Sequence, residues 1–187
     1  MSLSQVFDQH RLDCIAKYLN TGGMFLSAST LLVYRIENTK SSTAYTQRKR
    51  ALGLPPVPGL ALLPAQQQFQ KGMGTVLDGP NEHYLLHGTS YDGALGIAKE
   101  NFNFMYSKNM SLGRGFYLSD DPSTARQYLK SNRRAFVICR VLLANCTSAV
   151  GSIETAMHSG YDSLLSGRQF VVPSPELVLP EYLVVLD

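Results

Sequence analysis

Gln169 is a polar amide at the head of a short apolar run, residues 170–172, that predicts a buried strand. A strand within the core favours valine or isoleucine at such a position. The amide is therefore either an ordinary strand-edge residue or a hydrogen-bonding group that points into a site. A glutamine can hold a hydroxyl of a bound molecule, but it has neither the charge nor the basicity of a carboxylate.

Histidine and tyrosine are further residue types that could serve a binding or catalytic site. His87 ends the apolar segment "HYLLHG", and Tyr117 lies in "GFYLS" between "GRG" and a turn. Tyr128 follows Asp121 by seven residues, two turns along a predicted helix that can fold back over the strand. Taken alone, each has an ordinary explanation as a structural histidine, a core tyrosine or a helix-packing tyrosine.

Several common catalytic motifs are absent from the sequence. "GMGTVLDG" (72–79) begins like a dinucleotide fingerprint, but Leu77 replaces the third glycine and no convincing helix follows. The chain contains no P-loop and no G-x-S-x-G elbow. The four histidines are not spaced as metal ligands and HExxH is missing, so we expect no metal.

The composition predicts a globular protein with a real core. The 187 residues are 44% hydrophobic and carry a net charge of +3, which does not argue for nucleic-acid binding. No segment approaches the ~20 apolar residues of a membrane span, and "MSLSQVFDQHRLD" lacks the pattern of a secretory signal. Cys14, Cys139 and Cys146 have no CxxC spacing. The cysteines therefore predict a reducing, intracellular compartment, cytoplasmic or nuclear. We also expect the protein to be a monomer.

Short strands and helices alternate along the chain. Helices are predicted over 6–19, 44–52, 91–101 and 121–131, and strands over 30–37, 83–88, 115–119, 135–143, 168–172 and 181–187. Asp121 predicts an N-cap with Pro122 at the first helical position. Residues 53–69 contain four prolines and predict an irregular surface loop. From Asn81 onward, about five strands with short helices between them predict an α+β fold with mostly antiparallel sheets.

Three stretches of the sequence together indicate a family resemblance: "NEHYLLHGTS" (81–90), "GRGFYLSDDPSTARQY" (113–128) and "GRQFVVPSPELVLPEYLVVLD" (167–187). Their order and wording resemble the catalytic domain of the poly(ADP-ribose) polymerase family, the diphtheria-toxin-like ADP-ribosyltransferases. The first two are similar to the family's two signatures, and the third to its closing strands. The resemblance covers residues 30–187 and implies a catalytic domain there, with residues 1–29 as a helical extension. It implies the ADP-ribosyltransferase fold, with split β-sheets and short flanking helices.

The resemblance also implies that NAD+ is the co-substrate. The family breaks the nicotinamide–ribose bond through an oxocarbenium-like state, as in glycoside hydrolysis. It implies that Gly88 offers its backbone N–H and C=O to the carboxamide, while Tyr117 and Tyr128 stack on the ring. On the same resemblance, His87 binds a hydroxyl of the adenosine ribose and Thr89 braces the adjoining turn.

Two further parts of the donor site follow from the resemblance. Residues 103–112 correspond to the loop that covers NAD+, from which either Tyr106 or Lys108 closes over the dinucleotide. Ala125 stands where the family usually has a serine that bonds the carboxamide. One hydrogen bond is thus lost or supplied differently, and at ~1 kcal/mol this weakens binding severalfold.

Gln169 stands where chain-elongating members of the family carry a catalytic glutamate. A carboxylate there stabilises positive charge and polarises an incoming ribose hydroxyl, and its loss costs on the order of 10²–10³ in rate. We interpret Glu181, in the terminal "PEYL", as structural. The resemblance thus implies an enzyme that transfers a single ADP-ribose to protein side chains, its own included, and releases nicotinamide.

Three alternatives stay open at this point. The chain could be a catalytically silent domain that binds NAD+ or ADP-ribose, an NAD+ glycohydrolase with water as acceptor, or a transferase acting on nucleic-acid ends. Ala125 and Gln169 favour the silent domain. Against the silent domain stands the retention of all four residues that the resemblance assigns to the NAD+ site, His87, Gly88, Tyr117 and Tyr128. A site that had lost its function would have no reason to keep residues that bind nicotinamide.

Overall fold

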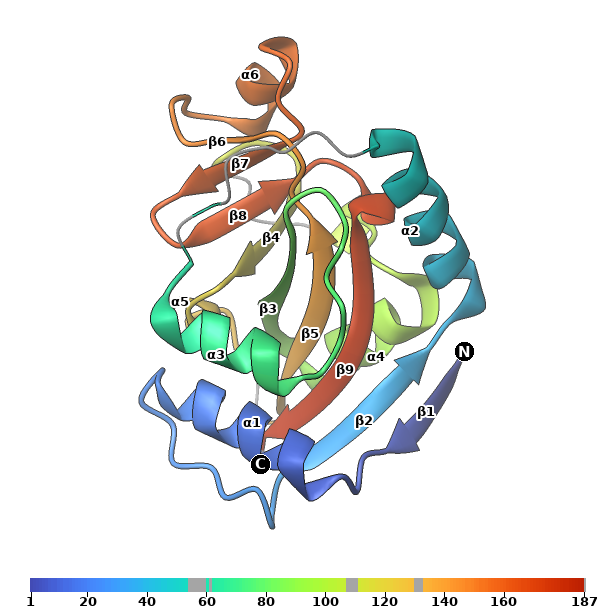
Figure 1. The fold of residues 1–187 in the computed structure, drawn as a ribbon, viewed down its shortest axis with the longest axis vertical. Helices are drawn as coiled ribbons and strands as arrows, with labels where there is room; N and C mark the ends of the chain where they lie inside the picture. The colour runs from blue at the N-terminus through green and yellow to red at the C-terminus, as the bar shows by residue number, and fades with distance from the viewer. Residues whose placement is uncertain (54–59, 61, 107–110, 130–132, 187) are drawn as a thin grey trace.

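A computed structural model describes residues 1–53, 60, 62–106, 111–129 and 133–186. The strands in these ranges are β1 (Ser2–Gln5), β2 (Leu32–Glu37), β3 (Glu82–Ser90), β4 (Phe116–Ser119), β5 (Arg134–Leu142), β6 (Cys146–Thr147), β7 (Ser163–Ser166), β8 (Gln169–Val172) and β9 (Val178–Leu186). They form one sheet in the order β1-β2-β9-β5-β3-β4-β8-β7-β6 (Figure 1). Of the neighbouring pairs, β6 and β7 run parallel and the others antiparallel. The predicted α+β class with mostly antiparallel strands is confirmed.

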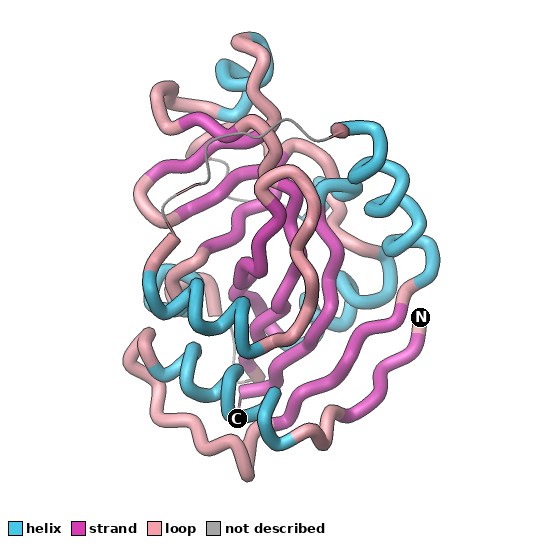
Figure 2. Tube along the Cα trace, viewed as in Figure 1, coloured by secondary structure: helices cyan, strands magenta, loops and turns pink. Residues whose placement is uncertain are grey.

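Helices lie on both faces of this sheet (Figure 2). The described helices are α1 (Gln9–Asn20), α2 (Thr39–Leu52), α3 (Pro64–Gly72), α4 (Tyr91–Glu100), α5 (Pro122–Arg126) and α6 (Ile153–His158), with the 3-10 turns η1 (Phe104–Tyr106) and η2 (Pro175–Leu177). Helices α1, α3 and α5 pack on one face, and α2 and α4 on the other. Asp121 caps α5 by accepting hydrogen bonds from Ser123 N and Thr124 N, as the sequence predicts.

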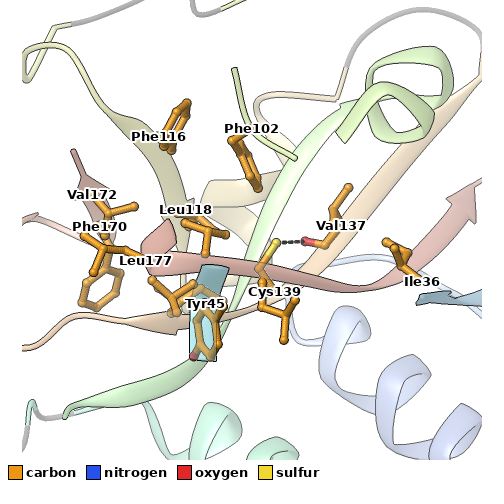
Figure 3. Packing of buried hydrophobic residues seen from close by; sticks show 14 of the residues in the cluster. Ile36, Tyr45, Phe102, Phe116, Leu118, Val137, Cys139, Phe170, Val172 and Leu177 are labelled. Carbon is orange, nitrogen blue, oxygen red and sulfur yellow. Dashed lines mark hydrogen bonds between the residues drawn. The ribbon is translucent and has the colours of Figure 1, made fainter. Parts of the chain in front are cut away.

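The alternation of side chains along the central strands produces two cores. On β5, Phe136 and Ile138 face the α1–α3–α5 side, whereas Val137 and Cys139 face the α2–α4 side. Figure 3 shows part of the second core, with Val137 and Cys139 among residues from α2, β4 and β8. Because β5 is buried on both faces, its sequence is apolar from Ala135 to Leu142 except at Arg140.

The sheet is divided between β3 and β4. Strand β3 pairs with β5 along all nine of its residues, from Glu82 to Ser90. It pairs with β4 at a single position, Leu86 with Ser119. Beyond this point the two strands diverge, so that the last residues of β3 lack a β4 neighbour in the ladder. This division corresponds to the split sheets expected from the sequence, and it creates the space in which the candidate site lies.

The prediction of an irregular loop over residues 53–69 is wrong for its last six residues, 64–69. Helix α3 begins at Pro64, because proline at the first helical position needs no N–H partner and already has a helical φ. The residues that follow, "AQQQFQK", are good helix formers apart from Phe69, which is buried against the sheet. Residues 54–59 and 61 lie outside the described residues.

Other boundaries differ from the prediction. Helix α5 ends at Arg126 rather than at residue 131, so Tyr128 lies in the turn after the helix. Residues 130–132 lie outside the described residues. Helix α2 begins at Thr39, five residues earlier than predicted, because Asn38 caps it by accepting from Ser41 N. The short strands β1 and β6 and the short helix α6 were not predicted, since elements of two to six residues carry little periodic signal.

The N-terminal segment joins the rest of the fold directly. Strand β1 pairs with β2 from Ser2 to Gln5. The buried residues of α1 belong to the same core as Phe136 and Val184 of the central strands. A domain boundary at residues 29 and 30 stays a proposal drawn from the sequence.

Candidate active site

One pocket lies where β3 and β4 diverge, between these strands and helix α4. It has a volume of about 630 Å³. Six of the residues predicted from the sequence line it, namely His87, Gly88, Thr89, Tyr106, Tyr117 and Tyr128. The pocket therefore brings together residues from four segments that are separate in the sequence. The two other predicted residues in the described chain, Ala125 and Gln169, contact members of this set.

His87 links β3 to β4 where the ladder between them has ended. Its Nδ1 lies 2.9 Å from the carbonyl oxygen of Tyr117. A carbonyl oxygen can only accept, so Nδ1 carries the proton of this bond. The ring also packs edge-to-face on Phe102, with 5.0 Å between centroids. These two contacts fix the orientation of the imidazole at the pocket wall.

Gly88 is required by the close approach of α5 to β3. A Cβ atom at this position would fall well inside 3.0 Å of the Ala125 carbonyl oxygen, and 3.4 Å from Cβ of Tyr128. Real Cβ atoms essentially never come that close to backbone, so any side chain here would push α5 away. Ala125 itself is buried and contacts the site through its carbonyl group. Its methyl group supplies no hydrogen bond of the kind a serine would.

Tyr117 presents a half-buried ring whose hydroxyl is held by the preceding loop. The hydroxyl accepts from Leu112 N at 2.9 Å and donates to Gly113 O at 2.8 Å. Burial raises the pKa of this phenol, so it stays protonated and keeps both bonds. The loop is braced in turn by α6, since Glu154 accepts from Arg114 N at 2.5 Å. The hydrogen bond from the Arg114 backbone N–H lowers the pKa of the Glu154 side chain, so the carboxylate stays ionised.

Tyr128 and Gln169 are in direct contact. The Gln169 side chain donates from Nε2 to the Tyr128 hydroxyl. Gln169 begins β8, where it pairs with Ser119 of β4 and Ser166 of β7. It is half-buried and does not line the pocket surface itself. Gln169 is thus connected to the pocket by its hydrogen bond to Tyr128, which lines it.

Thr89 and Tyr106 both line the pocket. Thr89 lies against the start of α4, where a Cβ on Gly93 would collide with its Oγ1 atom. Tyr106 ends the turn η1 and is 75% exposed, so its ring is available at the pocket rim. Lys108, the alternative covering residue, lies outside the described residues.

Helix α4 supplies pocket residues that the sequence analysis missed. Its pocket-facing residues include Asp92, Gly93, Gly96, Lys99 and Glu100. A usable signal was present, because two glycines three residues apart within a helix each cost ~1 kcal/mol relative to alanine and imply a reason for the missing side chains. Here the reason is local: Gly93 permits contact with Thr89, and Gly96 leaves open space along the pocket.

Glu181 lies away from the pocket in a buried ion network. Its carboxylate accepts from Arg35 at 3.1 Å and from the Tyr84 hydroxyl at 2.7 Å, and it pairs with Arg140 at 2.7 Å. A buried carboxylate with three such partners holds strands together. This geometry supports the structural interpretation of Glu181.

Among the described residues, no cluster of three or more histidine, cysteine, aspartate or glutamate side chains could hold a metal ion. None of the described helices is long and apolar enough to cross a membrane.

The family model described as the poly(ADP-ribose) polymerase catalytic domain matches residues 26–164, about three quarters of the chain. The match includes β3, β4, α4 and α5, which carry the pocket, and it ends before Gln169. A comparison with curated proteins finds no match. Catalytic domains of this family use NAD+ as the substrate of ADP-ribosyl transfer. The chain therefore belongs to the poly(ADP-ribose) polymerase catalytic domain family.

Proposed function

We propose that the protein is an NAD+-dependent mono-ADP-ribosyltransferase that modifies protein side chains, its own included, and releases nicotinamide. The observation that carries this proposal is the meeting of His87, Gly88, Tyr117 and Tyr128 in one pocket. These residues come from three separate segments, and the tight packing of α5 on Gly88 depends on the absence of a side chain there. A site with no use for nicotinamide would have no need of this arrangement.

The pocket suits a dinucleotide in size and in chemistry. Its volume falls within the ~300–1,000 Å³ typical of ligand pockets. Its lining combines aromatic rings (Phe102, Tyr117, Tyr128) with polar groups from α4 and from His87. Rings suit the flat nicotinamide, and hydrogen-bonding groups suit the ribose hydroxyls. The fit supports NAD+ as the substrate.

The proposed transfer breaks one bond and forms another at the ribose carbon to which nicotinamide is attached. The bond from that carbon to the nicotinamide nitrogen breaks, and its electron pair leaves with the nicotinamide, which becomes neutral. An oxygen of the acceptor side chain forms the new bond with one of its lone pairs. Tyr117 and Tyr128 would hold the leaving ring, and Gly88 would orient its carboxamide. The ribose carries positive charge at the point of transfer.

Transfer of a single unit follows from the chemistry of Gln169. Growth of a chain requires a ribose hydroxyl as the next acceptor, and a hydroxyl must be polarised by a base. Glutamine cannot take that proton. A carboxylate acceptor on a protein is already ionised at neutral pH, so it needs no base. We therefore propose acidic side chains as the acceptors.

Incubation with labelled NAD+ tests the proposal, with covalent label and free nicotinamide followed together. Label on protein at single-unit length supports the proposed function. Nicotinamide release without label would indicate hydrolysis, and NAD+ binding with neither signal would indicate a silent domain. His87→Ala should abolish the label. His10→Ala, on the exposed surface of α1, is the matched control and should leave it unchanged.

A further inference from the structure

We propose that helix α1 is a positioning element of the nucleotide pocket, and that Tyr18 on this helix acts on the site through Asp120. This inference rests on the proposed function. Tyr18 lies well before the matched family region, which begins at residue 26. Helix α1 lies beside α3 and contacts α5 (Figure 1). The contacts that carry the inference run from α1 to Asp120, just after β4, and from the turn after α1 to both ends of α5.

Tyr18 makes the first contact. Its side chain is 3% exposed and stacks on Phe69 of α3, with 4.4 Å between the ring centroids and an angle of 13° between the planes. Its hydroxyl donates to the backbone carbonyl of Asp120 at 2.6 Å. Burial raises the pKa of the phenol well above its usual value, so the hydroxyl remains a donor across the physiological range.

Asp120 connects this bond to two parts of the site. The next residue, Asp121, is the N-cap that starts α5. The Asp120 carboxylate is fully buried and pairs with Arg168, which immediately precedes Gln169. Ser119 reinforces the junction by donating from Oγ to Arg168 O at 2.7 Å. A displacement of Asp120 would therefore move both α5 and the start of β8.

The turn after α1 holds α5 along its length. A Cβ on Gly22 would fall within 3.0 Å of Pro122 and of Ser123 N, so the turn lies directly against the first residues of α5. At the other end, Arg126 donates from one guanidinium nitrogen to Gly22 O at 3.4 Å and to Gly23 O at 3.1 Å. Helix α5 has only five residues and depends on such outside contacts for its position.

Helix α5 transmits this position to the pocket. Its Ala125 carbonyl packs on Gly88 and accepts a hydrogen bond from Tyr128 N at 3.2 Å. Tyr128 in turn accepts the hydrogen bond of Gln169. Small displacements at an enzyme site carry large costs in rate, so a contact that sets the place of Tyr128 bears on binding and transfer.

The test compares Tyr18→Phe with Tyr45→Phe. Tyr45 is a matched control, since it is 2% exposed and its hydroxyl donates to Glu82 at 2.8 Å, away from the pocket. Both substitutions remove one buried hydroxyl and should lower Tm. We expect Tyr18→Phe alone to raise KM for NAD+, by about three- to tenfold, which is the usual size of one hydrogen bond. Equal KM values for the two variants, within twofold, would overturn the inference.

Hydrogen exchange separates this inference from the proposed function. Exchange of the backbone amides over residues 120–129 should rise in Tyr18→Phe and stay at the wild-type level in Tyr45→Phe. Unchanged exchange in Tyr18→Phe would overturn the inference whatever the activity. A wild-type protein that neither binds NAD+ nor releases nicotinamide would overturn the proposed function, and the positioning of a catalytic pocket with it, even if exchange rose.

A second variant tests the other contact without altering a buried residue. Arg126→Ala removes the bonds to Gly22 and Gly23, and we expect a severalfold higher KM. Arg126→Lys keeps a single cationic donor and should restore part of the loss. No change in KM for Arg126→Ala, measured beside Tyr18→Phe, would contradict a role for the turn after α1.

Discussion

The Gln169 side chain donates a hydrogen bond to the hydroxyl of Tyr128, forty-one residues earlier in the chain. The bond joins the first residue of β8 to the turn after α5. It links the residue that we propose limits the product to one ADP-ribose with a tyrosine that we propose stacks on nicotinamide. A substitution at either position should therefore alter the position and the hydrogen bonding of the other side chain.

Gln169→Glu should raise the transfer rate or permit short chains. A carboxylate can accept from the Tyr128 hydroxyl, so the contact is kept with its polarity reversed, and it adds the charge and basicity that an amide lacks. Product length on labelled protein, resolved by gel and mass spectrometry, gives the measurement. Gln169→Ala is the control and should fall below wild type, because it loses the bond to Tyr128. Identical products and rates for wild type and Gln169→Glu would mean that Gln169 does not occupy the product-limiting position.

Gly88→Ala should abolish NAD+ binding and destabilise the fold. The added methyl group meets the Ala125 carbonyl, which is backbone and cannot rotate away. Relief requires α5 to move, at a cost of about 1–3 kcal/mol. Calorimetric NAD+ binding and Tm give the two readouts. Gly151→Ala is the matched control, since a Cβ there meets no atom within 4 Å, and it should behave as wild type. Tight binding by Gly88→Ala would argue against the proposed carboxamide site.

The ring and the hydroxyl of Tyr117 should make separable contributions. Tyr117→Phe keeps the ring but leaves Leu112 N and Gly113 O without this partner, so we expect a lower Tm and a modest rise in KM. Tyr117→Ala also removes the stacking surface, and KM should rise by roughly a further tenfold. Steady-state kinetics with NAD+ measure both values. Equal KM values for the two variants would show that the ring does not contact the substrate.

His83 should make stability depend on pH in the acidic range. It is half-buried on β3, and neither of its ring nitrogens, both shielded from solvent, has a hydrogen-bond partner in the described chain. Burial lowers its pKa from 6.5 to about 4. Between these values the unfolded chain binds a proton that the folded protein does not, so the free energy of unfolding falls as the pH drops from 6.5 towards 4. The loss is about 3 kcal/mol.

Urea unfolding at several pH values checks this expectation. His83→Gln has no titrating ring, so its free energy of unfolding should fall less steeply than that of wild type over the same range. Parallel slopes for the two proteins would contradict a buried, neutral His83.

The central strands and the residue types of the site could be read from the linear chain. The apolar segments of β5 and β9, the Asp121 cap and the placement of His87 on β3 all follow from local pattern. Helix α3 was missed because prolines before it suggested a loop, although Pro64 is a favourable start for a helix. Helix α5 is shorter than predicted, because its end depends on contacts with β3 and with the turn after α1.

Residue types, their order and the amide at position 169 are local properties, which the amino-acid sequence determines by itself. The contacts between distant segments are of a different kind. The bond from Gln169 to Tyr128, the packing of α5 on Gly88 and the bond from Tyr18 to Asp120 join residues 37 to 102 positions apart. Such contacts form only when the strands have paired and the helices have packed, because the free energy that brings these residues together comes from burial of the whole core.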